Sequence, residues 1–503
     1  MTKNWFYTAL LSVAISHLFV SCEKEVVPEN PDDPVAAANK YVNTWIYSDV
    51  MSVYYLWNDK MGANPNNTLN PDAFFNSILY KFDKDLAPDG DRFSWIQENY
   101  LDLLASLSGV ASNELGFEYQ LYAYNEHEVF GEFAYIKKDT DAATKDFKRG
   151  QAFTHVNNTS LTIDNYRTVL SNATRNTNVT LKVWDVSIDL DAKRIYFDNE
   201  QNITLNLSNK YAENPILLDS IYTINGKTIG YLVYNFFSPD SGDETGAYDV
   251  ALNNVMGRFR TRGVNHLILD LRYNSGGRVS SAIYLSSMIV TNLNTSNVFC
   301  KVEYNKEYNK WLVDNYGTEF LIDKFTDKVV VHDRDGKVKN TFDLNNIGNL
   351  QNVTILTGSG TASASEMVIN GLKPYMDIFL IGAVTVGKNV ASASFYKEND
   401  SKNKWGIQPI IAKYFNSRGE SDFASGFTPD YIDSDDWNMP KKELGDINEA
   451  LLGAAIRHIS GETLTKTFQT RSLQPAPAFL REVGSSFGNK AWNNQIITNV
   501  PLP

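Results

Sequence analysis

The sequence predicts a multidomain protein of the α/β class. The chain has 503 residues, a length that suggests two to four domains. Apolar runs at residues 266–272 and 353–356 are typical of buried strands, and each is followed by a Gly-containing turn and then by a helical pattern. Such alternation of strands and helices indicates an α/β core.

The overall composition is that of a globular protein with enough apolar material for a large core. Hydrophobic residues make up 43% of the chain and charged residues 21%. The formal net charge is −13, and no basic stripe offsets it. This balance argues against a nucleic-acid partner.

The N-terminus has the pattern of an export signal. Lys3 precedes an apolar run at residues 5–20, and polarity changes abruptly after Cys22. The sequence LFVSC at 18–22 resembles a bacterial lipoprotein signal, which implies a signal peptide over 1–21 and acylation of Cys22. We therefore expect a lipid anchor in the bacterial cell envelope, facing the periplasm or the cell surface. An ordinary signal peptide, in which Cys22 is incidental, remains an alternative.

The stretch after the signal and the cysteine count fit a lipid anchor. Residues 22–35 are acidic and Pro-rich, which is typical of a tether. The only other cysteine is Cys300, so lipidation of Cys22 would leave no intramolecular disulfide.

Residues 36–108 are predicted to form a small N-terminal helical domain. Apolar and aromatic residues recur at spacings of three and four between Val42 and Trp57, with polar residues between them. A second helix is expected over 71–82. The stripe of aromatic residues indicates packing against another domain rather than a ligand site.

Residues 109–186 are β-rich. Alternation of apolar and polar residues at 117–122 and again at 179–183 predicts strands. The segment 142–158 resembles the core of the PDZ domains found in bacterial proteases, although Gln151 replaces their usual Asp. The resemblance implies a PDZ-like module, which binds an extended peptide by adding it to a sheet edge. It also implies that Leu115, Gly116 and Phe117 lie at the peptide carboxylate end.

Three serines compete as nucleophiles in the stretch that follows the strand at 353–356. They are Ser359, Ser363 and Ser365, and a serine hydroxyl needs a base to remove its proton. None of the six histidines has a recognisable catalytic context. Lys388 could act as the base if burial lowered its pKa, but the residues alone favour a solvated loop lysine.

Two further features of this region allow either a structural or a catalytic role. Ser363 and Glu366 have the spacing of a capping box at the start of a helix. The pair Gly276-Gly277 could form only a tight turn, or it could expose a backbone N–H group to an oxyanion, as could the helix N-terminus at Ala364.

The order of the motifs resembles that of the C-terminal processing (tail-specific) serine peptidases. TASASE at 361–366, followed by Gly382 and TVGK at 385–388, is similar to their SASASE and GE.T.GKG elements. LDLRYNSGG at 269–277 is similar to LDLR.NPGG, and GFTPD at 426–430 to GI.PD. The resemblance implies a crotonase-like (spiral ββα) α/β protease core over 187–465 and a C-terminal tail over 466–503.

The resemblance also implies roles for individual residues. Ser363 would be the nucleophile, and Lys388, 25 residues later, would be the general base. Glu366 would assist them. The backbone N–H groups of Ala364 and of the Gly276-Gly277 turn would form the oxyanion hole. No metal or cofactor is implied.

The sequence departs from the family pattern at three positions near these residues. Asn389 replaces the usual Gly after the lysine, and Ser275 replaces Pro in the glycine turn. Ser392 stands where many members have a glutamine that hydrogen-bonds the lysine. These departures leave open how readily Lys388 loses its proton.

The expected function is therefore that of an exported, lipid-anchored serine endopeptidase that cleaves polypeptides through an acyl-enzyme. One alternative is a catalytically inactive, PDZ-bearing peptide-binding lipoprotein in which Ser363 and Glu366 only cap a helix. Another is a crotonase-like enzyme that acts on acyl thioesters, against which the signal and the PDZ-like segment argue.

Overall fold

The computed structural model describes residues 33–189, 192–333, 336–433, 441–464, 479–487 and 495–497. The predicted signal peptide, Cys22 and most of the predicted tether lie outside the described residues. Among the helices in these ranges, none is both long and apolar enough to cross a membrane.

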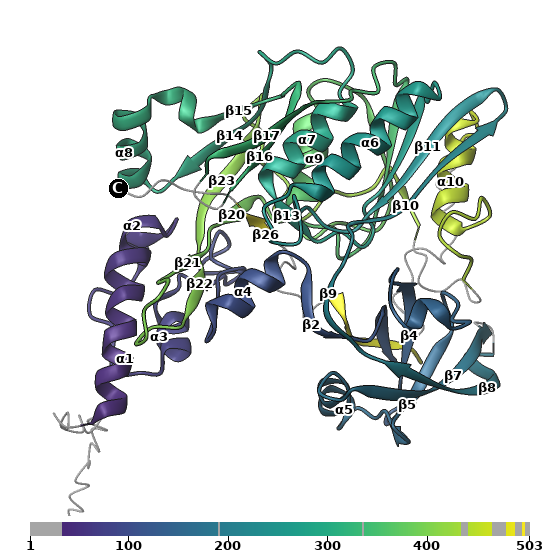
Figure 1. Cartoon of the computed structure of the whole chain (residues 1–503), viewed down its shortest axis with the longest axis horizontal. Coiled ribbons are helices and arrows are strands. Elements are labelled where there is room, and N and C mark those ends of the chain that lie inside the picture. Colours follow the sequence, from purple (N-terminus) through teal and green to yellow (C-terminus); the bar gives the residue numbers. More distant parts are fainter. Residues whose placement is uncertain are drawn as a thin grey trace, which may run out of the picture.

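The largest part of the molecule is built on a six-stranded sheet (Figure 1). In order across the sheet, its strands are β10 (Ile216–Ile224), β11 (Lys227–Tyr234), β12 (His266–Asp270), β18 (Asn352–Thr357), β19 (Ile378–Gly382) and β24 (Tyr431–Ile432). Only the edge strand β10 is antiparallel to its neighbour. The predicted strands at 266–272 and 353–356 are confirmed as β12 and β18.

Helices cover both faces of this sheet, as the apolar runs predict. The helices are α6 (Ala247–Thr261), α7 (Val279–Ile289) and α9 (Ala364–Leu372) on one face and α10 (Ala450–Ile459) on the other. Successive residues of β12 alternate between the two cores: Leu267 and Leu269 pack with α6, α7 and α9, whereas Ile268 packs with α10. The connections through α6, α7 and α9 place the turns after β12 and β18 side by side at one end of the sheet.

A second six-stranded sheet lies beside the first and includes a strand from the C-terminal tail. In order, its strands are β13 (Gly276–Arg278), β26 (Gln495–Ile497), β20 (Val390–Ser392), β23 (Ile410–Asn416), β14 (Val298–Tyr304) and β15 (Ile322–Lys324). Strand β26 thus separates the glycine turn at β13 from the strand that follows Lys388.

The chain between α7 and β18 makes an excursion over the outside of the core. It contains α8 (Lys306–Tyr316), the 3₁₀ turn Thr318–Leu321, and the paired strands β16 (Lys328–His332) and β17 (Val338–Asp343).

The N-terminal segment is largely helical but has no core of its own. Its elements are α1 (Pro34–Thr44), the π-helix Trp45–Met51, α2 (Ser52–Tyr54), α3 (Pro71–Ile78), β1 (Trp95–Gln97) and α4 (Tyr100–Leu107). Trp45 and Tyr54 belong to the same hydrophobic cluster as the α/β core. Strand β1 joins a small sheet with β22 (Gly406–Gln408) and β21 (Phe395–Tyr396). The separate helical domain predicted over 36–108 is therefore part of the same packing unit as the core.

The start of α1 corrects the predicted tether. The side chain of Asp33 accepts hydrogen bonds from the N–H groups of Val35 and Ala36, and the helix begins at Pro34. Asp33 is a favourable N-cap and Pro suits the first helical position. The folded region thus begins slightly before the predicted boundary at residue 35.

The β-rich unit has its own core and lies apart from the N-terminal helices (Figure 1). It contains β2 (Val110–Glu114), β3 (Phe117–Ala123), β4 (Val129–Ile136), β5 (Ala152–Val156), β6 (Thr159–Ser160), α5 (Tyr166–Ala173), β7 (Asn178–Asp189), β8 (Arg194–Asn206), β9 (Ser208–Ala212) and β25 (Arg481–Ser485). Because β8 pairs with β7 and β9 pairs with β2, the unit extends to Ala212. The predicted boundary at 186 is too early because the long β7–β8 hairpin crosses it.

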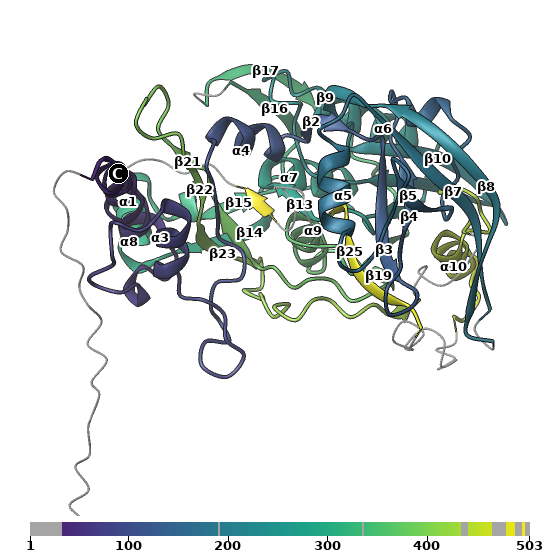
Figure 2. The same ribbon diagram turned by 90° about the horizontal axis from the view of Figure 1, so that it is seen from below.

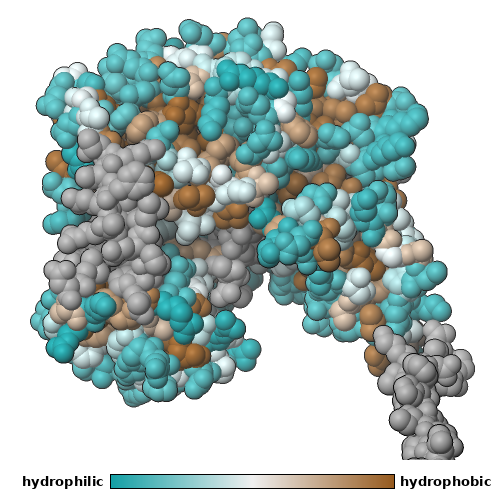
Figure 3. Space-filling model, turned by 180° about the vertical axis from the view of Figure 1, so that it is seen from behind, coloured by the Kyte–Doolittle hydropathy of each residue, from teal (hydrophilic) through white to brown (hydrophobic). Residues whose placement is uncertain are grey.

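Seen from behind, the surface is notched between the two lower lobes, the β-rich unit and the N-terminal helices (Figure 3). Apolar residues, in brown, are visible on the wall above this notch.

Candidate active site

The predicted site residues converge where the turns after β12 and β18 meet. The hydroxyl of Thr361 donates to the carbonyl of Leu271 at 2.8 Å, and that of Ser365 donates to the carbonyl of Asn274 at 3.0 Å. These turns lie at the carboxyl ends of parallel strands, which is where open α/β sheets usually bind their ligands.

Ser363 has an unusual backbone conformation. Its φ is 65° and its ψ is −116°, and the turn around it is closed by a 3.1 Å hydrogen bond from Ser365 N–H to the carbonyl of Ala362. These angles match the first central position of a type II′ turn, which favours glycine. A serine held there stores backbone strain, and strain of this kind is concentrated at active sites.

The three candidate serines differ sharply in their surroundings. Ser359 is exposed, and the hydroxyl of Ser365 is engaged by Asn274. The side chain of Ser363 is fully buried, and its Oγ has no hydrogen-bond partner among the described residues. An unpaired buried hydroxyl costs about 1–3 kcal/mol. The structure thus singles out Ser363 as the serine whose hydroxyl is kept available.

One carboxylate joins the Ser363 turn to the Lys388 loop. Oε2 of Glu366 accepts hydrogen bonds from the backbone N–H groups of Ser363 and Lys388, both at 2.8 Å. Its Oε1 accepts from Gly387 N–H at 2.7 Å and from the Thr385 hydroxyl at 2.5 Å. Burial raises the pKa of Glu366, while these four hydrogen bonds favour the ionised form. Glu366 therefore brings Ser363 and Lys388 to the same place.

The capping-box interpretation accounts for only part of this geometry. Ser363 and Glu366 occupy the N-cap and N3 positions of α9, and the Glu366 side chain accepts from the Ser363 N–H group. The Ser363 side chain faces the N–H group of Glu366, but its Oγ does not form a hydrogen bond. The unusual φ and ψ of Ser363 explain this, because an N-cap that bonds through its side chain normally has extended backbone angles.

Lys388 lies in a fully buried environment. Burial lowers its pKa from 10.5 to about 7; the charges of Asp91 and Glu366 act in the opposite direction, and that of Arg92 adds to the lowering. Its Nζ lies 4.8 Å from the centre of the Phe93 ring. These surroundings exclude the interpretation of Lys388 as a solvated loop lysine.

The sequence analysis did not predict any role for Arg92. Its guanidinium donates to the carbonyl of Gly387 at 2.8 Å and to that of Ala424 at 3.2 Å, so it braces the loop that presents Lys388. The neighbouring Asp91 is fixed by the hydroxyl of Tyr55 at 2.9 Å. No local pattern indicates the contact between Arg92 and Gly387, because these residues are 295 positions apart in the chain.

A glutamine lies next to Ser392, the position where the family pattern has one. Gln408, on β22, is fully buried, and its Nε2 donates to the Ser392 hydroxyl at 3.1 Å. Its Oε1 accepts from the Ser394 hydroxyl at 2.7 Å. Ser392, on strand β20 after Lys388, and Gln408, on β22, thus form a buried polar pair.

The two predicted glycine donors face different partners. The N–H group of Gly276 is engaged by Oδ1 of Asn274 at 2.9 Å, which corrects its predicted place in the oxyanion hole. Phe237 N–H donates to the Gly276 carbonyl, and Arg278 N–H donates to the Phe237 carbonyl. Because hydrogen-bonding groups alternate along a strand, the N–H group of Gly277 points to the opposite edge of β13.

The remaining predicted donor is at the start of α9. The helix begins at Ala364, whose N–H group belongs to the first turn and has no carbonyl partner within the helix.

Gly277 has a φ of 137°, and a Cβ atom there would lie 2.1 Å from the carbonyl oxygen of Phe237. This position therefore requires glycine.

A buried ionic network anchors the turn after β12. The guanidinium of Arg272 bonds Asp270 and forms two hydrogen bonds with Glu449, the N-cap of α10. Arg149, from the β-rich unit, lies 3.8 Å from Glu449 and donates to the Tyr273 hydroxyl at 3.0 Å. The network ties the β-rich unit directly to the residues that precede the glycine turn.

The loop predicted to bind a peptide carboxylate is closed in the structure. The side chains of Leu115 and Phe117 are buried in the core of the β-rich unit. The N–H group of Gly116 is engaged by the carboxylate of Glu114 at 3.0 Å. Because a carboxylate of the chain already holds this N–H group, the structure does not support the predicted carboxylate site.

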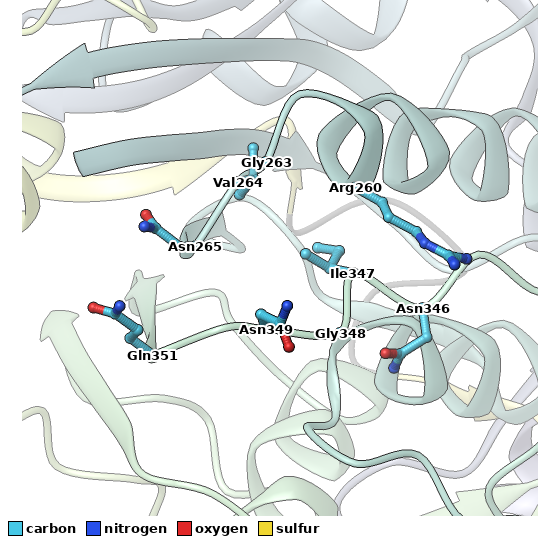
Figure 4. Close-up of a pocket in the computed structure, with 9 residues that line it drawn as sticks. All are labelled: Arg260, Gly263, Val264, Asn265, Asn346, Ile347, Gly348, Asn349 and Gln351. Carbon is cyan, nitrogen blue, oxygen red and sulfur yellow. The ribbon is translucent and has the colours of Figure 1, made fainter. Parts of the chain in front are cut away.

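The structure has another pocket, of about 620 Å³, far from this site. Two segments line it: Arg260 and residues 263–265 from one, and residues 346–349 and Gln351 from the other (Figure 4). These residues precede β12 and β18, so the pocket lies at the amino ends of the strands, opposite the Ser363 turn. In the part of the chain that the structure describes, no group of His, Cys, Asp or Glu residues is arranged to hold a metal ion.

Comparisons with known proteins point to one family. The profile described as peptidase family S41 matches residues 228–432, and that of the peptidase S41 N-terminal domain matches residues 41–95. Together they cover more than half of the chain. The first includes the turns after β12 and β18 and the Lys388 loop, and the second ends at the Asp91–Phe93 region.

Individual relatives agree with these profiles. A crystal structure of a putative S41 protease from Bacteroides fragilis is similar with a TM-score of 0.64 and 26% identity, over 83% of this chain and 97% of that one. A probable CtpA-like serine protease from Staphylococcus epidermidis is 25% identical over 37% of this chain and 30% of its own length. Carboxyl-terminal-processing peptidase 2 of Arabidopsis thaliana is 24% identical over 41% of this chain and 32% of its own length. The chain thus matches only about a third of the length of these curated relatives.

Proposed function

Because this chain belongs to peptidase family S41, we propose that it is a serine endopeptidase in which Ser363 is the nucleophile and Lys388 the general base. The observation that carries this proposal is the Glu366 carboxylate, which accepts the backbone N–H groups of both residues. A buried serine hydroxyl with no hydrogen-bond partner among the described residues and a buried lysine with a pKa of about 7, both held by their backbones at Glu366, are the groups that Ser–Lys catalysis needs.

The proposed reaction proceeds through an acyl-enzyme. Neutral Lys388 removes the proton from Ser363 Oγ as Oγ attacks the substrate carbonyl carbon. The resulting ammonium returns the proton to the leaving amine, and the peptide bond breaks. Lys388 then removes a proton from a water molecule, which attacks the ester carbonyl, and the proton returns to Ser363 Oγ as the acid product leaves. The backbone N–H groups of Gly277 and Ala364 would stabilise the oxyanion in both stages.

The β-rich unit would act as a PDZ-like module that presents a polypeptide to this site. Its strand β3 and helix α5 flank the extended strand β25 of the same chain. This is the arrangement in which a peptide binds by strand addition. The sequence at 18–22 supports a lipid anchor on Cys22 in the bacterial cell envelope, so that the substrates would be polypeptides outside the cytoplasm. A crotonase-like arrangement of the core would be consistent with the succession of parallel strands and helices around β12 and β18.

Incubation with an unfolded protein such as casein tests the proposal. We expect the wild-type protein to release fragments without an added metal or cofactor, and the Ser363→Ala variant to release none. Equal release by the two proteins would show that Ser363 is not the nucleophile.

Substitution of Gly277 by alanine should impair catalysis through the turn. The added Cβ would lie 2.1 Å from the Phe237 carbonyl oxygen, so the backbone must shift and the N–H group of residue 277 must move with it. We expect kcat to fall about 10²–10³-fold, the loss typical of one oxyanion-hole donor. Gly263→Ala is a matched control, because Gly263 also has a positive φ, of 68°, but open space around it. A Gly277→Ala variant with wild-type kcat would exclude this role for the turn.

Substitution of Arg92 by glutamine should shift the pH dependence of catalysis. The positive charge of Arg92 helps to lower the pKa of Lys388, so its removal should raise that pKa. We expect the rising limb of kcat/KM against pH to move upward by roughly 0.5–1 pH unit. Arg92→Lys keeps the charge and should leave the limb near its wild-type position. An unchanged profile in Arg92→Gln would show that Arg92 only supports the loop mechanically.

A further inference from the structure

The C-terminal segment 479–487 occupies the free edge of β3. Its strand β25 pairs antiparallel with β3, with Arg481 opposite Ala123 and Ser485 opposite Gln120. Figure 2 shows β25, in yellow, beside β3 and α5. The chain thus adds one of its own segments as an extra strand to the sheet of the β-rich unit.

This segment is held on both sides of a groove between β3 and α5. The hydroxyl of Tyr166, on α5, donates to the carbonyl of Val483 at 2.9 Å. Val483 packs against the core of the β-rich unit, and Leu480 is only 2% exposed, in a cluster with Tyr122 and Phe130. The two side chains lie on opposite faces of the sheet, because Tyr122 and Phe130 belong to the core on the side away from α5. The bound strand therefore has one apolar subsite in the groove, at Val483, and a second on the other face of the sheet, at Leu480.

The far end of the groove suits a hydroxyl rather than a chain terminus. The Ser486 hydroxyl accepts from Tyr119 N–H at 2.9 Å and donates to the Glu118 carboxylate. Glu118 belongs to a buried cluster in which one lysine, Lys137, contacts three glutamates. The excess negative charge would repel a terminal carboxylate. The groove thus fits an internal segment of a polypeptide.

The C-terminal residues continue from this groove to the candidate active site. The ring of Phe487 stacks on that of Tyr273, with centroids 5.2 Å apart and planes 3° apart. Tyr273 directly precedes Asn274, which holds the glycine turn. Further along, strand β26 pairs with Gly276 and Gly277 on one side and with Ser392 on the other. It covers the edge of β13 to which the N–H group of Gly277 points.

We propose that the β3–α5 groove and the edge of β13 together form the binding path for an internal, extended segment of a polypeptide substrate. The C-terminal segments 479–487 and 495–497 occupy this path as an intramolecular competitor. The occupant that the groove selects has apolar residues at the places of Leu480 and Val483, a hydroxyl at that of Ser486 and an aromatic ring at that of Phe487. This inference rests on the proposed peptidase function, and it adds the substrate segment and a means of regulation.

Tethering makes the competitor effective even if its intrinsic affinity is weak. The segment belongs to the same chain as the groove, so its binding is intramolecular and its effective concentration can reach the millimolar range. A polypeptide substrate at micromolar concentration would bind only when the C-terminal segment leaves the groove. Weakening the segment should therefore increase substrate binding, and fixing it in place should abolish binding.

A disulfide provides the fixed state. Gln120 and Ser485 are directly paired across β3 and β25, and residues paired in this way have Cα separations that a disulfide can span. The full-length Gln120→Cys/Ser485→Cys variant, with Cys22 replaced by serine, can be oxidised and then reduced, and its one other cysteine, Cys300, is buried. The released state is the full-length Val483→Asp variant, in which a charge replaces the partly buried apolar side chain that packs against the core. Arg481→Ala is its control, since it changes the net charge equally at an exposed position.

Two measurements on these proteins test the inference. The first is fluorescence-anisotropy binding of a labelled peptide with the sequence FLREVGSSF, in a Ser363→Ala background. The second is cleavage of casein by the same tail variants with Ser363 intact. For both, we expect Val483→Asp to exceed wild type at least 10-fold, Arg481→Ala to match wild type, and the oxidised disulfide form to fall at least 10-fold below its reduced form.

Equal peptide binding by the oxidised and reduced forms would overturn the inference, as would wild-type peptide affinity in Val483→Asp. The two readouts separate this proposal from the peptidase proposal. If all variants fail to cleave but the binding differences appear, the peptidase function is wrong and the competitor role of the C-terminal segment stands.

Discussion

The Ser363→Ala variant is expected to lose about 10⁶-fold in kcat, the order of loss measured when a serine peptidase loses its nucleophile. The hydroxyl of Ser363 has no hydrogen-bond partner among the described residues, so its removal breaks no hydrogen bond there. We therefore expect the melting temperature of the variant to equal or exceed that of the wild type. Cleavage of casein, followed together with thermal unfolding, provides both quantities.

Ser359→Ala is the matched control for this loss. Ser359 lies four residues earlier in the same turn region, and its side chain is exposed. It should retain wild-type kcat and stability. A large loss of activity in Ser359→Ala, or a Ser363→Ala variant that is inactive because it unfolds, would contradict the assignment of Ser363.

Replacement of Lys388 by methionine is expected to abolish cleavage, with a loss of kcat comparable to that of Ser363→Ala, because no base remains for the serine. In the wild type, kcat/KM should rise with pH and level off above about pH 7, where Lys388 becomes neutral. Measurement of kcat/KM between pH 5 and pH 9 checks this profile.

The stability of the Lys388→Met variant follows from the same pKa. Lys388 titrates at about 7 in the folded protein and near 10.5 in the unfolded chain. The unfolded state therefore binds more protons between these values, so the lysine costs stability as pH falls from 10.5 to 7, and the full cost persists below pH 7. Lys388→Met should remove this cost and should not lower the melting temperature near pH 7. A strongly destabilised variant would indicate that Lys388 has a structural role.

The sequence predicted those parts of the fold that depend on local patterns. The apolar runs of β12 and β18, the small residues that begin α9 and the glycine turn at β13 all have strong local signals, and the structure contains each of them. Two glycines with positive φ angles, Gly276 and Gly277, mark a turn that few other residues can form. The resemblance to known motifs then ranked Ser363 above its neighbours, which the local pattern could not do.

The parts that the sequence did not predict depend on contacts between distant residues. Strand β25 contains a glycine and charged residues, and it forms a strand because β3 offers an unpaired edge. The aromatic stripe of the N-terminal helices was correctly predicted to pack against another part of the chain, but the sequence could not identify its partners, which lie hundreds of residues away. The extent of the β-rich unit was also misjudged, because alternation within a strand does not show that β8 pairs with β7 or that β9 pairs with β2.

The candidate site shows the same division. The spacing of Ser363 and Glu366 is visible in the sequence, but a capping box and a catalytic site share that spacing. Only the structure shows that the Glu366 carboxylate also binds the N–H groups of Gly387 and Lys388. Likewise, the side chain of Asn274 accepts a hydrogen bond from the N–H group of Gly276 within the same turn. The sequence motif does not indicate this hydrogen bond.

The measurement that tests the central claim most directly is the pH dependence of the acylation of Ser363. The full-length protein would be treated with an acylating or phosphonylating serine reagent from pH 5 to pH 9, and the modified residue identified by peptide mass spectrometry. The Ser–Lys account predicts one adduct, on Ser363, formed at a rate that rises with pH through an apparent pKa of about 7 and becomes negligible in Lys388→Met. An adduct on Ser359 or Ser365, or a rate on Ser363 that is the same in Lys388→Met, would contradict it.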